Sequence, residues 1–148
     1  MAGKKISEVK LVSFNEIADS RGKLVSLEAN VNIPFDIERV YYLFATKNGA
    51  ERGFHAHIKL KQMAICVSGS CTIDVESIQG KASYQLDTPA KGLVMEGIVW
   101  REIRNFSNDC VLIVIADARY SEDDYIRNHD EFEEALYTNF PHYTDYTQ

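Results

Sequence analysis

The stretch ERGFHAHIKLKQMAICVSGS, residues 51–70, places two histidines two positions apart just after a glycine and continues into an apolar run. Side chains at positions i and i+2 of a strand point to the same face, so His55 and His57 share one side. Two imidazoles then converge on one small volume. The pattern predicts a strand that carries a metal site, a catalytic pair without a metal, or two buried histidines with a structural role.

The segments around this stretch are short, rich in β-branched and aromatic residues, and separated by turn formers. They recur about every 8–12 residues, a spacing typical of antiparallel sandwiches and barrels. The sequence therefore predicts an all-β fold. The expected strands outside residues 51–61 cover 23–29, 39–46, 62–69, 70–77, 83–88, 92–96 and 110–118.

One segment near the end of the chain reads as a helix, over about residues 121–137. Ser121 is its expected N-cap, with Asp124 reaching back to the first turn. An apolar stripe follows at roughly helical spacing and is expected to pack on the sheet: Tyr125, Ile126, Phe132 and Leu136. With no repeat or linker in the sequence, we expect one domain over residues 1–148, with an N-terminal strand or arm over about residues 1–13.

The amino-acid composition argues against some classes of function. The chain has 148 residues, 45% of them hydrophobic, and a formal net charge of −6. An acidic chain is a poor nucleic-acid binder, so we expect no nucleic-acid partner. The sequence shows neither a long apolar run nor a secretory signal, so we expect no membrane association and a cytoplasmic protein. The three cysteines, Cys66, Cys71 and Cys110, lack CxxC spacing and are expected to be structural; Cys66 and Cys110 lie in apolar runs, where buried free thiols are common.

The histidine pair resembles the first motif of the cupins, which are small double-stranded β-helix, or jelly-roll, barrels. In that motif an acidic residue follows the HxH pair; here Gln62 takes its place, and Gly69 closes the motif. A second cupin motif supplies a third histidine, and here Trp100 or Arg101 occupies that position. Neither indole nor guanidinium offers a lone pair to a cation. We therefore expect no metal and favour acid/base chemistry by neutral histidines; a metal-dependent dioxygenase would need the ligand set restored.

Nearby residues suggest a pocket for an anionic, hydroxyl-rich ligand. In the strand RVYYLF, residues 39–44, alternation puts Tyr41 on one face and Tyr42 on the other, and either phenol could enter the pocket. Three arginines are candidates for contacting phosphate or polarising a carbonyl group: Arg21, Arg52 and Arg101. Arg101 is the strongest of these, since its motif position is expected to point inward.

Three stretches together resemble the sugar 3,4-ketoisomerases, a WxcM-like group of cupins: RVYYLFATKNGAERGFHAHIKLKQ (residues 39–62), PAKGLVMEGIVWREI (89–103) and DDYIRN (123–128). The similarity extends from about Phe14 to Phe132. It implies isomerisation of dTDP-4-keto-6-deoxy-D-glucose to a 3-keto sugar, on routes to surface glycans or glycosylated natural products. It also implies no metal or redox cofactor, and a homodimer that pairs or exchanges N-terminal strands.

The resemblance also implies roles for the candidate residues. His55 is the expected base for the C3 proton, His57 a relay, and Tyr41 a proton shuttle to a carbonyl oxygen. Arg101 and Arg52 are expected to stabilise the enediolate, and Tyr42 and Gln62 to bind substrate. Arg21 and Arg101 are expected to influence the C4 configuration, whose outcome stays open.

Two alternative activities also stay open. One is a 3,5-epimerase-like enzyme that acts on a 4-keto sugar nucleotide. The other is a non-catalytic cupin that binds nucleotide sugars.

Overall fold

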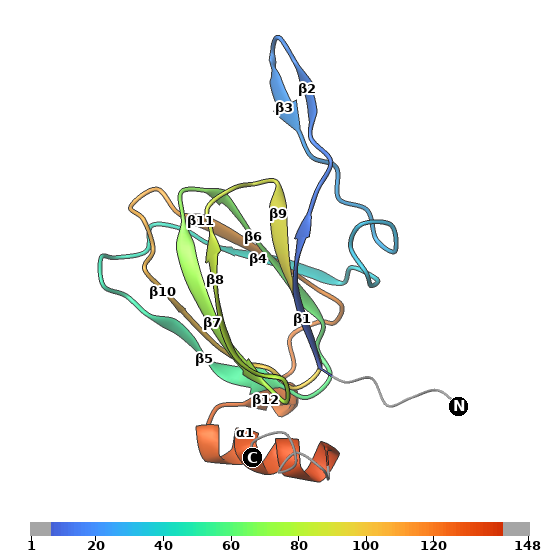
Figure 1. The fold of residues 1–148 in the computed structure, drawn as a ribbon, viewed down its shortest axis with the longest axis vertical. Helices are drawn as coiled ribbons and strands as arrows, with labels where there is room; N and C mark the ends of the chain where they lie inside the picture. The colour runs from blue at the N-terminus through green and yellow to red at the C-terminus, as the bar shows by residue number, and fades with distance from the viewer. Residues whose placement is uncertain (1–6, 141–148) are drawn as a thin grey trace.

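Two five-stranded antiparallel sheets face each other in the computed structural model, which describes residues 7–140 (Figure 1). The first sheet has the order β1 (Glu8–Ser13), β9 (Lys91–Glu96), β6 (Gln62–Ser68), β11 (Val111–Ala116) and β4 (Arg39–Leu43). The second has the order β12 (Tyr125–Ile126), β5 (Arg52–His57), β10 (Trp100–Arg104), β7 (Cys71–Ser77) and β8 (Gly80–Leu86). The predicted all-β fold of the cupin type is confirmed.

Burial explains which segments become central strands. In β7 buried and half-buried positions alternate, and three of the four buried residues, Cys71, Ile73 and Val75, join the core between the sheets. β6 is instead buried at five successive positions. Its second face is covered by the segment after β3, through Ile33 and Phe35. An apolar run with both faces covered is therefore stable as a strand.

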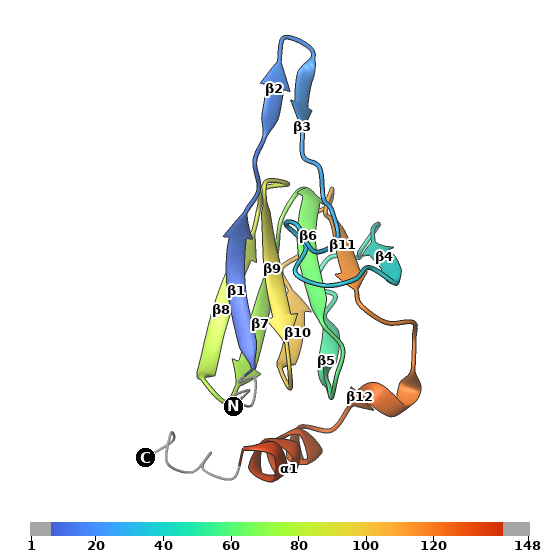
Figure 2. The same cartoon turned by 90° about the vertical axis from the view of Figure 1, so that its right-hand side faces the viewer.

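A short hairpin, β2 (Ile17–Asp19) and β3 (Gly22–Leu24), projects away from the two sheets (Figure 1, Figure 2). The predicted strand over residues 23–29 is wrong beyond Leu24. The chain there turns irregularly, because the Asn32 side chain accepts from the Glu28 backbone and donates to the Ser26 carbonyl. Such local side-chain bonds compete with strand pairing.

The C-terminal helix begins later than the sequence predicted. Residues from 122 form a 3-10 turn, η1 (Glu122–Asp124), followed by β12, and α1 covers His129–Asn139. Ser121 makes no capping bond, whereas the Asn128 side chain accepts from the backbone nitrogens of Asp130 and Glu131.

The late start allows a strand pairing, because β12 lies beside β5 with Tyr125 opposite His57. α1 packs Phe132 and Leu136 against the outside of the second sheet, beside Ala56 and Trp100. Between residues 7 and 140 no helix has the length and apolarity needed to cross a membrane.

Candidate active site

A cavity of about 530 Å³ opens between the two sheets. Its walls come from β4, β5, β6 and β10 and from the segment that leads into α1. Five of the residues selected from the sequence line it together: Tyr41, Arg52, His55, Gln62 and Arg101. Tyr125 and Arg127 line it as well, so all three stretches that carry the resemblance meet around one space.

Gly53 sets the close approach of β5 to β10. It has φ +91°, and a Cβ there would lie 2.8 Å from the Arg101 carbonyl oxygen. Glycine alone tolerates both the left-handed backbone and this contact. The two strands then pair with His55 opposite Arg101, beside a register shift between Arg101 and Glu102. Because Gly53 has no side chain, the two strands lie close enough to bring the His55 imidazole beside the Arg101 guanidinium.

His55 lines the cavity, and among residues 7–140 only its Nδ1 has a hydrogen-bond partner. Its Nδ1 lies 3.1 Å from the Gly53 carbonyl oxygen, which can only accept, so Nδ1 carries the hydrogen and Nε2 does not. Burial, followed by the nearby charge of Arg101, lowers the pKa of His55 to about 4. His55 is therefore a neutral imidazole at pH 7, ready to accept a proton.

His57 lies deeper, 1% exposed, with its ring 4.9 Å from that of His55. Its Nδ1 donates to Oδ2 of Asp124 over 3.2 Å, and its buried Nε2 has no hydrogen-bond partner among residues 7–140. Burial first, then Arg101 and His55, lowers the pKa of His57 to about 2. It lines a second cavity of about 260 Å³, which shares Arg39 and Tyr125 with the larger one.

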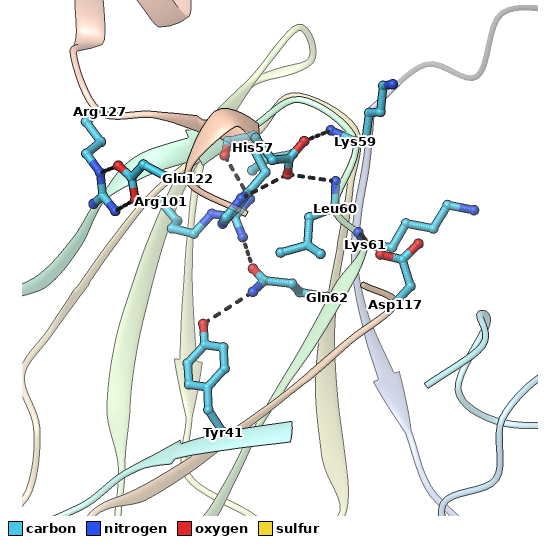
Figure 3. Close-up of polar contacts among 12 residues, drawn as sticks. Tyr41, His57, Lys59, Leu60, Lys61, Gln62, Arg101, Asp117, Glu122 and Arg127 are labelled. Carbon is cyan, nitrogen blue, oxygen red and sulfur yellow. Dashed lines mark hydrogen bonds and ion pairs between the residues drawn. The ribbon is translucent and has the colours of Figure 1, made fainter. Parts of the chain in front are cut away.

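Arg101, Gln62 and Tyr41 form a chain of hydrogen bonds across the cavity floor (Figure 3). Nη1 of Arg101 donates to the amide oxygen of Gln62, and Nη2 donates to the Val99 carbonyl at 2.9 Å. The Gln62 amide nitrogen donates to the Tyr41 hydroxyl at 3.2 Å. Burial lowers the pKa of Arg101 to about 10, which leaves it charged at neutral pH.

The mouth of the cavity is basic and aromatic. The Arg127 guanidinium lies 4.2 Å from the centre of the Tyr125 ring and pairs with Glu122 at 2.7 Å. The Arg39 guanidinium lies over the rings of Tyr41 and Tyr120. Arg52 and Arg127 are exposed and Arg39 is half-buried, and all three line the cavity with donors suited to phosphate oxygens.

Two residues expected at the site lie elsewhere in this chain. Tyr42 is 61% exposed and faces a surface depression that it shares with Phe44, on the side of β4 away from Tyr41. Strand alternation permits one of the two tyrosines to face the cavity, and that one is Tyr41. Arg21 is exposed at the turn of the hairpin, where it pairs with Asp19 at 2.6 Å.

Sequence reasoning missed four residues of the site: Arg39, Asp124, Tyr125 and Arg127. Arg39 lies two positions before Tyr41 in the same strand, so strand alternation would have placed it on the face of Tyr41. The other three belong to the DDYIRN motif. All three were assigned to the predicted helix, where Asp124 was expected to cap the first turn and Tyr125 to belong to the apolar stripe, so none was considered as a site residue.

Two groups of three potential metal ligands occur among residues 7–140, and neither includes His55 or His57. One consists of the buried free thiols Cys66, Cys71 and Cys110. The other, Glu76, His129 and Glu133, lies on the outer side of the second sheet, where α1 begins.

Comparison with known proteins identifies the family. The FdtA family model, described as WxcM-like, C-terminal, matches residues 7–137. A TDP-4-oxo-6-deoxy-alpha-D-glucose-3,4-oxoisomerase from Aneurinibacillus thermoaerophilus is 48% identical over 129 residues, 87% of this chain and 93% of the relative.

Two solved structures of a related enzyme support the same family assignment. The 3,4-ketoisomerase QdtA from Thermoanaerobacterium thermosaccharolyticum, in complex with TDP, matches with TM-score 0.86 and 40% identity over 89% of this chain and 96% of its own. A histidine-to-asparagine variant of QdtA, in complex with TDP-4-keto-6-deoxyglucose, matches over the same shares with TM-score 0.85 and 39% identity. This chain therefore belongs to the WxcM-like family of sugar 3,4-ketoisomerases.

Proposed function

We propose that this protein converts dTDP-4-keto-6-deoxy-D-glucose into a dTDP-3-keto-6-deoxy-D-hexose by histidine acid/base proton transfer through an enediol. The observation that carries the proposal is His55: a neutral imidazole whose Nε2 has no hydrogen-bond partner among the described residues, in a cavity that Tyr41 and a buried arginine also line. The substrate follows from the relatives, one named for a TDP-4-oxo sugar and one solved with TDP-4-keto-6-deoxyglucose.

The reaction moves a carbonyl group by one carbon without net redox change. His55 Nε2 takes the C3 proton, the electron pair forms the C3–C4 double bond, and the C4 oxygen takes a proton from Tyr41. The Tyr41 oxygen then recovers a proton from the C3 hydroxyl, and protonated His55 delivers its proton to C4. Both residues return to their starting states, and the product is the 3-keto sugar.

The buried arginine supplies the electrostatic part of this mechanism. Negative charge develops on the substrate oxygens as the C3 proton leaves. The Arg101 guanidinium is 2% exposed, and it is held in place by its bonds to Gln62 and the Val99 carbonyl. A fixed cation in a site with little water stabilises such charge without reorganising. At the mouth, we assign Arg39, Arg52 and Arg127 to the diphosphate of the nucleotide.

We propose that the reaction needs no metal, on the basis of the donor set. A catalytic first-row metal site usually has three protein ligands, and the two histidines lie beside a neutral amide, Gln62, and a guanidinium, Arg101. The charge of Arg101 repels a second cation at the same place. Metal analysis of protein purified without chelator tests this point, and stoichiometric iron or zinc would overturn it.

We also propose a homodimer built through the N-terminal strands, acting in the cytoplasm on a route to a surface glycan. In this chain β1 pairs with β9, and the β2–β3 hairpin leaves the barrel with Ile17 and Leu24 exposed. A projecting hairpin with apolar side chains suits contact with a second copy. Residues 1–6 of the expected arm lie outside the described residues. Light scattering at micromolar concentration tests the dimer; a monomer would contradict it.

The decisive experiment is incubation with dTDP-4-keto-6-deoxy-D-glucose, coupled to a 3-aminotransferase. A 3-amino sugar nucleotide is expected, and its absence would overturn the proposal. Proton NMR of the fresh product identifies the C4 configuration from ring coupling constants. The same spectra separate the alternatives, because an epimerase changes C3 and C5 while the ketone stays at C4, and a binding protein leaves the substrate unchanged.

A further inference from the structure

Gln62 lies in the wall of the cavity but is 1% exposed. Its amide oxygen accepts from Nη1 of Arg101, and its amide nitrogen donates to the hydroxyl of Tyr41 over 3.2 Å. Both ends of the side chain are therefore engaged by protein groups. This arrangement does not suit a substrate ligand, the role expected for Gln62 from the sequence.

Arg101 fixes the direction of this chain of bonds. A guanidinium has donors and no acceptor, so the end of the amide that faces it must be the oxygen. The NH₂ group of Gln62 then faces Tyr41, and the phenol oxygen accepts its hydrogen. Within residues 7–140 the Gln62 amide is the one hydrogen-bond partner of the Tyr41 hydroxyl. The phenolic hydrogen is consequently free to point into the cavity.

We propose that Gln62 is a positioning residue, which transmits the charge of Arg101 to Tyr41 and fixes the Tyr41 hydroxyl as the proton donor to a substrate oxygen. The inference rests on the proposed ketoisomerase function. It explains why an uncharged amide stands at this position. An amide has one accepting end and one donating end, whereas a carboxylate would accept from both neighbours.

The same bonds stabilise the phenolate form of Tyr41. When Tyr41 gives up its hydrogen, the phenolate oxygen faces the N–H of Gln62, which Arg101 polarises from the other side. Burial raises the pKa of Tyr41, while the charge of Arg101 and the hydrogen bond from Gln62 act in the opposite direction. Gln62 thus offsets part of the cost of a buried phenolate.

Gln62→Glu tests the inference with almost no change in shape. The new carboxylate accepts from both Arg101 and Tyr41, so it turns the phenolic hydrogen away from the cavity. We expect kcat to fall at least about tenfold, and KM to change by less than about threefold, since no ground-state contact to substrate is lost. The pKa of Tyr41 should rise, measured as an ultraviolet difference titration against Tyr41→Phe.

The matched control is Gln85→Glu, the same chemical change at an exposed position of β8, which should leave both readouts unchanged. All assays contain a chelator, because a carboxylate beside His55 and His57 would complete a cupin-type ligand set. This condition keeps an engineered metal site from imitating or masking the effect.

A double-mutant cycle separates positioning from direct binding. If Gln62 acts through Tyr41, Gln62→Glu should cause no further loss of turnover in the Tyr41→Phe background. Losses that multiply would overturn the inference. If the wild type fails to isomerise the sugar, the proposed function fails. The Tyr41 titration then still decides the inference, and an unchanged Tyr41 pKa in Gln62→Glu would overturn it.

Discussion

The carboxylate Oδ2 of Asp124 lies 3.2 Å from Nδ1 of His57, although 67 positions separate the two residues in the sequence. The same carboxylate accepts the backbone N–H groups of Lys59 and Leu60. One side chain therefore ties the segment before α1 to the end of β5 and the residues that follow it. Because a carboxylate only accepts, it also fixes the tautomer of His57 with Nδ1 protonated.

Replacing Asp124 should affect stability and turnover together. Asp124→Asn weakens three hydrogen bonds to a charged acceptor, so we expect the free energy of unfolding to fall by about 1–3 kcal/mol. An amide can either accept or donate, so His57 is no longer held in one tautomer. Turnover should therefore fall by about tenfold or more. Urea unfolding and steady-state kinetics measure the two effects. Asp123→Asn, at the exposed neighbouring position, should change neither; equal effects in both variants would point to net charge instead.

His55→Asn removes the proposed base while it keeps a polar side chain of similar size. We expect turnover to fall by at least about two orders of magnitude, the range typical of positioned proton transfer. Binding of dTDP, measured by calorimetry, should persist, because the assigned diphosphate contacts come from arginines at the mouth. Near-normal turnover in this variant would remove His55 from the mechanism.

Acid should weaken the fold through the two histidines. In the unfolded chain both have a pKa of about 6.5, whereas in the folded protein the pKa of His55 is about 4 and that of His57 about 2. As pH falls below 6.5, the unfolded chain binds protons that the folded protein does not, so stability falls. The urea midpoint should therefore be lower at pH 5 than at pH 7.5.

The His55→Asn variant provides the control for this pH dependence. It lacks one of the two shifted groups, so its urea midpoint should change less between pH 7.5 and pH 5 than that of the wild type. An identical pH dependence in the two proteins would assign the effect to other groups. The comparison needs folded protein only and is independent of any substrate.

Gly53→Ala should disturb the contact between β5 and β10. The added Cβ would lie 2.8 Å from a backbone oxygen of Arg101, which cannot move as a side-chain end can. Gly80→Ala is the matched control, since φ is also positive there, at +106°, but no atom lies within 4 Å of the added carbon. We expect Gly53→Ala to lose about 1–3 kcal/mol more stability than Gly80→Ala, by urea unfolding. Equal losses would assign the whole effect to backbone strain.

The sequence predicted most of the barrel because its strands carry local signals. Alternation and β-branched content located β4, β6, β7, β9 and β11 closely. The strands β2, β10 and β12 were missed, because β2 is exposed, β10 carries three charged residues among its five, and β12 has two residues. Such elements depend on tertiary pairing, which no local pattern encodes.

The site was predictable where it follows strand geometry. His55, Arg101 and Tyr41 met as expected, because each sits at an inward-facing strand position. Asp124 could not be placed in the same way. Its role depends on a chain reversal that returns residues 122–126 to β5, and its local sequence context is equally typical of a helix start.

The buried thiols provide a way to observe opening of the barrel in solution. Cys66, Cys71 and Cys110 gather beneath the β6–β7 turn, where Ser70 and Ser107 join two loops by hydrogen bonds. A thiol reagent can reach them only after that end of the barrel opens, so the labelling rate measures the free energy of opening. The loops lie at the end of the barrel away from α1 (Figure 1). Comparing the labelling rates with and without dTDP would therefore show whether ligand binding also stabilises that end of the barrel.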